Sequence, residues 1–225
     1  MAGQDRRDRT NDFQFDSFTA TKLAEWQATG AEVLLSSEFA TFLERLQEFS
    51  LDVRARQFES VMARFEGGRQ ESETAAEVIN AIAHSLCLGV PGRARDIINK
   101  SLQETLFYCT AGDPDLPPSV FGERLESFLR RGKGRGLIAF FLKIHLFNLI
   151  WIDLHEHMQA DGGTSETLKK RSKGVENLCH SVVYSCLRSE RSPSELDSSA
   201  VSNLIYAVER NLTNRSNSNS LFRLA

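Results

Sequence analysis

The sequence lacks the features that mark disordered, disulfide-stabilised or secreted proteins. It has only 5 prolines in 225 residues, against 15 phenylalanines, so we expect most of the chain to be ordered. Its four cysteines are too scattered for a disulfide framework or a zinc module. They are Cys87, Cys109, Cys179 and Cys186. The polar start MAGQDRRDRTND has no apolar core and does not resemble a signal peptide, so we expect an intracellular, cytoplasmic protein, with the nucleus as the alternative.

Positive and negative charges are nearly balanced: the sequence has 27 Lys and Arg and 30 Asp and Glu, which gives a formal net charge of -3. This balance argues against a surface that binds nucleic acid over its whole extent and leaves room only for a local basic patch. The hydrophobic fraction of 41% is sufficient for a sizeable core. We predict a flexible polar segment over 1–16, a single all-helical domain over 17–212 and a polar tail over 213–225.

Strand alternation is nearly absent, whereas apolar residues recur at helical spacing in successive segments. The clearest helix begins after a capping box of Thr74 and Glu77, whose side chains satisfy the first free backbone amides, and it stops before Gly89 and Pro91. We therefore predict an all-α protein, a compact multi-helix bundle of about eight or nine helices. The alternative is a short α-solenoid built from helix pairs.

The longest apolar run extends from Leu137 to Ile152. It is shorter than the ~20 residues that a bilayer needs, and it includes polar side chains, so we predict a buried central helix over 137–158 and no membrane span. On a helical wheel the apolar arc comprises Phe140, Ile144, Phe147, Ile150, Trp151, Leu154 and Met158. We expect this arc to face the core and the second half of the helix to emerge toward solvent. The opposite side comprises His145, Asn148, His155, Glu156 and Gln159.

Lys143 lies within the apolar arc of that helix. We interpret it as a side chain that reaches solvent along the helix surface. The alternative is a buried lysine with a lowered pKa, which would be catalytic or would need a carboxylate partner.

The stretch RGKGRG, residues 131 to 136, is basic and glycine-spaced and precedes the apolar helix. It is not a P-loop, because no strand precedes it and no Ser or Thr follows the lysine. Free amides at a helix start can nevertheless bind an anion. The candidate anion-binding residues are Arg130, Arg131, Lys133 and Arg135. A plain connector is the alternative. The run LKKRSKG at 168–174 is either an extension of the same basic patch or a set of solvated lysines on a helix face.

The sequence contains none of the catalytic or metal-binding motifs that we sought, among them G-x-S-x-G and H-E-x-x-H, so we expect no metal and no cofactor. The leading hypothesis is a protein–protein interaction or regulatory module without catalytic activity, which binds another protein through a helical groove or an apolar patch. Its candidate contacts are Phe13, Phe15 and Phe18, aromatic residues in a polar segment, and the alternative is that they pack on the protein's own core. The alternatives are a domain that binds an anionic ligand or nucleic acid at residues 130–135 and, more weakly, an enzyme with Lys143 or His145 in a central polar pocket.

Overall fold

The part of the chain that the structure describes is an all-α bundle without any strand, which confirms the predicted fold class. The structure, a computed structural model, describes residues 19, 21–23, 25–26, 36–55, 58–65, 73–131, 135–160, 164–189, 206 and 210. The elements with assigned bounds are α2 (Ser37–Ala55), α3 (Phe58–Phe65), α4 (Ala75–Leu86), α5 (Gly92–Phe107), the 3-10 helix η1 (Tyr108–Thr110), α6 (Pro118–Arg131), α7 (Arg135–Ala160) and α8 (Ser165–Ser189).

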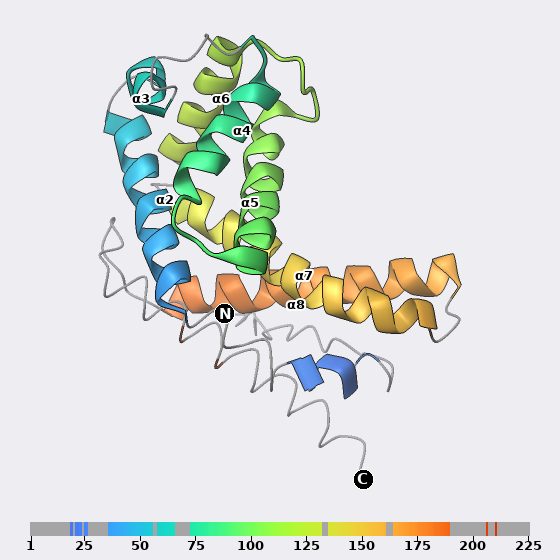
Figure 1. Cartoon of the computed structure of the whole chain (residues 1–225). Helices are drawn as coiled ribbons and strands as arrows, with labels where there is room; N and C mark the ends of the chain where they lie inside the picture. The colour runs from blue at the N-terminus through green and yellow to red at the C-terminus, as the bar shows by residue number, and fades with distance from the viewer. Residues whose placement is uncertain are drawn as a thin grey trace, which may run out of the picture.

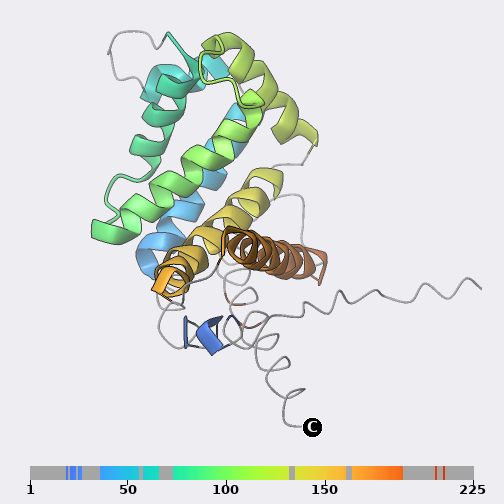
Figure 2. The same cartoon turned by 90° about the vertical axis from the view of Figure 1, so that its right-hand side faces the viewer.

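The helices are arranged as a bundle and a projecting pair. In Figure 1, α2, α4, α5 and α6 lie side by side, and the short α3 packs near one end of this group. The long helices α7 and α8 form an antiparallel pair that crosses the other end and extends beyond it (Figures 1 and 2). Because α2 contacts α6 and α7, which are distant in sequence, the helices do not stack only on their chain neighbours as those of a solenoid do.

The predicted start and end of α4 are confirmed. The Thr74 hydroxyl accepts a hydrogen bond from the Glu77 amide at 3.3 Å, and the Glu77 carboxylate accepts one from the Thr74 amide at 3.2 Å. The helix ends at Leu86, and Gly89 then adopts a left-handed φ of 83° that reverses the chain toward α5. Local sequence chemistry therefore determines this corner of the bundle.

An aromatic cluster of the core lies where α2 meets α7. The rings of Phe39, Phe42 and Phe141 are fully buried, and the Phe42 and Phe141 centroids are 5.1 Å apart. Tilted aromatic pairs at this separation are favourable in addition to the apolar area that they bury. This cluster attaches the first half of α7 to the bundle.

A glycine allows α3 to approach α6 closely. Gly122 of α6 faces the buried ring of Phe58, and a Cβ built on this glycine would lie 3.0 Å or less from three atoms of that ring. The ring is held on two sides, because it packs edge-on against Phe121 at 5.6 Å and the Phe58 amide donates to Glu126 Oε1 at 2.9 Å. Phe58 therefore has little freedom to move away from an added side chain.

We expect Gly122→Ala to lower the free energy of unfolding by about 1–3 kcal/mol, the usual effect of overpacking. In an unhindered helix the same change would raise stability by up to about 1 kcal/mol, so the sign of the effect is diagnostic. Urea unfolding of the variant measures it. In a Phe58→Leu background the loss should shrink, because the clashing ring is gone; a stabilised Gly122→Ala protein would contradict the close packing.

Candidate functional site

Helix α7 is oriented differently from the wheel prediction. His145 and Asn148, assigned to the polar side, are 0% and 5% exposed. Within the apolar arc, Ile150 and Leu154 are buried as expected, and the Met158 side chain lies outside the described residues. The other four residues of the arc are only half-buried, and their spacing of four, three and four residues places them on one face. We call this set the α7 stripe: Phe140, Ile144, Phe147 and Trp151.

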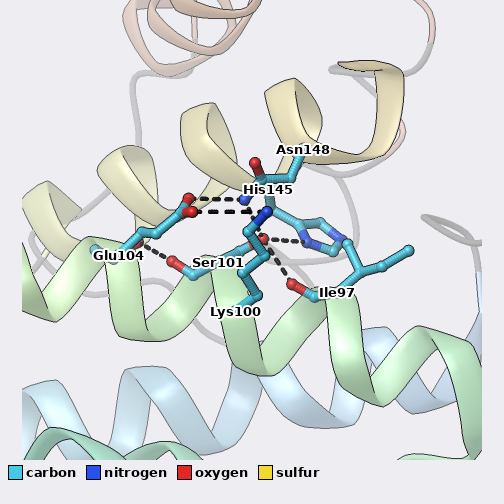
Figure 3. Close-up of polar contacts among 7 residues, drawn as sticks. Ile97, Lys100, Ser101, Glu104, His145 and Asn148 are labelled. Carbon is cyan, nitrogen blue, oxygen red and sulfur yellow. Dashed lines mark hydrogen bonds and ion pairs between the residues drawn. The ribbon is translucent and has the colours of Figure 1, made fainter. Parts of the chain in front are cut away.

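The polar residues of α7 are buried because α5 provides their partners (Figure 3). The Asn148 Nδ2 donates to Ser101 Oγ at 3.1 Å and to Glu104 Oε2 at 2.8 Å, which uses both of its hydrogens. His145 Nδ1 lies 3.3 Å from the same Ser101 hydroxyl. Buried polar groups need such partners, so the facing side of α5 determines which side of α7 is inside.

The hydrogen bonds of Ser101 identify the tautomer of His145. The single hydroxyl hydrogen of Ser101 is donated to the Ile97 carbonyl at 2.7 Å, so Ser101 Oγ can only accept from His145. His145 therefore carries its proton on Nδ1, and its Nε2 is buried without a hydrogen-bond partner. The ring stacks on Phe39 and Phe141, with centroids 4.8 and 5.3 Å away. Burial lowers its pKa to about 3, so the imidazole is neutral at physiological pH.

The geometry of this network fits a structural role better than a catalytic one. His145 and Ser101 are both 0% exposed, so no substrate reaches either side chain in this conformation. The hydroxyl proton of Ser101 is already donated to a backbone carbonyl, which leaves the serine unactivated as a nucleophile. The network reaches solvent through Glu104, which lines a surface pocket.

That pocket has a volume of about 1110 Å³ and lies between α5, η1, α7 and α8. Its apolar wall includes Phe107, Tyr108, Phe140 and Ile144. The Tyr108 ring is 64% exposed and contacts the Phe140 ring at a centroid distance of 4.7 Å. A smaller pocket of about 330 Å³ follows along α7 and α8, with Trp151 and Leu168 in its lining, and Glu176 lines both pockets. We call the two pockets together the groove.

Lys143 lies at the edge of the groove and has the carboxylate partner that its position requires. Its Nζ is 3.0 Å from Glu176 Oε1, and its side chain is 18% exposed. Lys173 approaches the other oxygen of Glu176 at 2.8 Å. Hydrogen bonds from Lys173 and Lys143 lower the pKa of the Glu176 carboxyl group. The lysine is thus both partly buried and paired, and its ammonium group also lies 5.7 Å from the centre of the Phe140 ring.

The structure separates the two basic runs. Residues 168–174 lie beside the second half of α7, since Leu168 and Lys169 share a pocket with Trp151, whereas the loop after Arg131 precedes the start of α7. Because α7 and α8 are antiparallel, the position of residues 168–174 fits the alternative that their lysines are solvated side chains of a helix face. Arg130 pairs with Glu126 at 2.8 Å, and Arg131 is exposed. Lys133 and the Arg135 side chain lie outside the described residues, and anion binding at this loop stays a prediction.

The cysteines match the interpretation that they are small apolar residues. All four are free and buried, and burial raises the pKa of Cys87 and Cys109 to about 11 and that of Cys179 to about 12. Such thiols are protonated and unreactive at neutral pH. In the described part of the chain, no group of three His, Cys, Asp or Glu side chains is placed to hold a metal ion.

No protein-family model, curated protein or solved structure matches this chain. Its function must therefore be argued from its own geometry. The candidate contacts Phe13, Phe15 and Phe18 lie outside the described residues, and the groove is the candidate binding surface in the part of the chain that the structure describes. Sequence analysis had not singled out Tyr108 or Glu104, because nothing local shows that they lie beside α7.

Helix α7 contains a candidate membrane-spanning segment. Over Gly136–His157 it is long and apolar enough to cross a bilayer, so the argument from the shorter run Leu137–Ile152 does not exclude a span. In the structure 65% of this apolar window is buried inside the protein, and the core helices of soluble proteins have the same length and composition. The absence of a membrane span and the intracellular location both stay predictions.

Proposed function

We propose that the protein is a protein–protein interaction module and that its partner binds in the groove between α5, η1, α7 and α8. The observation that carries the proposal is the α7 stripe, four large apolar side chains on one helical face that the bundle leaves half-buried. The stripe continues into the exposed ring of Tyr108. Contiguous apolar surface of this kind is characteristic of interaction sites.

The composition of the groove supports a protein as the ligand. Tyrosine and tryptophan contribute most to binding energy at protein interfaces, and Tyr108 and Trp151 line the two pockets. The polar network under the groove holds α5 and α7 together, through Asn148 and Glu104, so the binding surface is preformed. An intracellular location and a regulatory role fit this proposal and belong to it as expectations.

The test compares the proteins that the intact chain and a variant of the α7 stripe capture from native lysate. The stripe variant combines Phe140→Ser and Trp151→Ser, because these two aromatic residues line the two pockets. We expect it to capture at least about tenfold less of the partner from native lysate, since each aromatic anchor contributes about 1–2 kcal/mol or more. Quantitative mass spectrometry of the captured proteins gives the ratio, and circular dichroism verifies the fold.

The matched control removes an exposed apolar side chain elsewhere. Leu88 is 51% exposed in the turn between α4 and α5, and it lines neither pocket. Leu88→Ser should retain the same proteins as the intact chain. If a folded stripe variant retains every protein that the intact chain does, the groove is not the binding surface.

A further inference from the structure

The charges along the groove are not evenly distributed. In the smaller pocket, Lys169 and Lys173 lie beside a single carboxylate, that of Glu176. Glu176 is also paired with Lys143, which lines the larger pocket. Lys169 is exposed and forms no ion pair with the described residues. This stretch therefore carries an excess of positive charge directly beside Trp151.

The length of the α7 stripe matches that of a short ligand helix. Its first and last residues, Phe140 and Trp151, are eleven residues apart on α7, which corresponds to about 16 Å at the rise of an α-helix. A ligand helix of three turns, with apolar side chains repeating at three and four residues, presents anchors over the same length. The described part of the chain has no sheet edge to which an extended peptide could add a strand.

We propose that the groove binds an amphipathic helix of a partner protein whose apolar face is flanked by acidic residues. The proposal rests on the proposed function and specifies the partner. The apolar side chains of the helix would fill the two pockets, and its carboxylates would meet Lys169 and Lys173 at the α8 edge. Charge pairs at the edge of an interface contribute mainly to specificity and to the rate of association.

An anionic membrane surface has the same charge and is the main rival. The observations favour a helix, because the surface has two pockets, of about 1110 and 330 Å³, and an apolar wall in the larger one. Proteins that lie on a membrane surface instead insert protruding apolar side chains between the lipids.

The test uses the full chain and two labelled synthetic peptides of about 16 residues. Both carry leucine at the spacing of the α7 stripe on an alanine background, and their flanking positions are glutamate in one and lysine in the other. We expect fluorescence anisotropy at low salt to show at least about tenfold tighter binding of the acidic peptide. The preference should shrink at about 0.5 M NaCl, where exposed charges are screened.

Neighbouring lysines provide a matched pair of variants. Lys169→Glu should reduce the preference for the acidic peptide at least about threefold, since it reverses a charge at the edge of the groove. Lys170→Glu makes the same change one residue later, at an exposed position that lines neither pocket, and should leave the preference intact.

Several results would overturn the proposal: binding of neither peptide, equal binding of both, or equal effects of the two lysine variants. So would binding to vesicles of phosphatidylserine and phosphatidylcholine without binding to the acidic peptide. If the stripe variant loses captured partners but the peptides show no charge preference, only this inference fails and the proposed function stands. If capture is also unchanged, both fail.

Discussion

Phe141→Ala is expected to lower the free energy of unfolding by about 3–5 kcal/mol, the usual loss for a large aromatic ring removed from a core. The ring of Phe141 is 0% exposed and packs against Phe39 and Phe42 of α2 at centroid distances of 6.3 and 5.1 Å. Neighbouring side chains refill such a space only partly, so the variant loses both apolar burial and packing. Denaturant unfolding at neutral pH measures the loss.

The adjacent residue is the matched control. Phe140 is chemically identical but belongs to the α7 stripe, where it is half-buried in the wall of the large pocket. Phe140→Ala should cost less, about 1–2.5 kcal/mol, because part of the ring already contacts solvent and its removal leaves no closed cavity. The same variant should weaken binding in the groove. Equal losses for the two variants, or the reverse order, would show that the stripe faces the core and would remove the basis of the proposed function.

The second large effect concerns pH. His145 is neutral and buried with a pKa of about 3, whereas the unfolded chain binds a proton at the ordinary histidine pKa of 6.5. Above pH 6.5, His145 is neutral in both the folded and the unfolded chain, and its full contribution to the free energy of unfolding is present. As the pH falls from 6.5 toward 3, only the unfolded chain binds the proton, and this stability is lost. The free energy of unfolding should fall by about 1.4 kcal/mol per pH unit, which amounts to about 2 kcal/mol at pH 5.

A His145→Leu variant isolates this contribution. At pH 7 its stability should lie within about 1 kcal/mol of that of the intact protein, because it loses the long hydrogen bond to Ser101 but also removes the unpartnered Nε2. Between pH 7 and pH 5 its stability relative to that of the intact protein should rise by about 2 kcal/mol. Unfolding curves between pH 6.5 and 5 suffice, since ordinary carboxyl groups titrate mostly below that range. If the two proteins have parallel pH profiles in this window, His145 is not buried as a neutral group.

The groove was predictable from the sequence only in part. The spacing of Phe140, Ile144, Phe147 and Trp151 shows that they share a helical face, but they were assigned to the core because apolar residues are usually buried. The prediction failed since α5 offers Ser101 and Glu104 to the polar side of α7. No periodicity within α7 contains that information, because the partners lie some 40 residues earlier on another helix.

The sequence by itself determined what depends on neighbours along the chain. The capping box at Thr74, the turn at Gly89 and the helical periodicity of each segment depend on atoms within a few residues, and the all-α bundle followed from them. Only the tertiary structure decided which face of α7 is inside and which residues line the groove. Burial is a property of pairs of surfaces, and a buried histidine or asparagine is stable only where a distant helix supplies its hydrogen-bond partners.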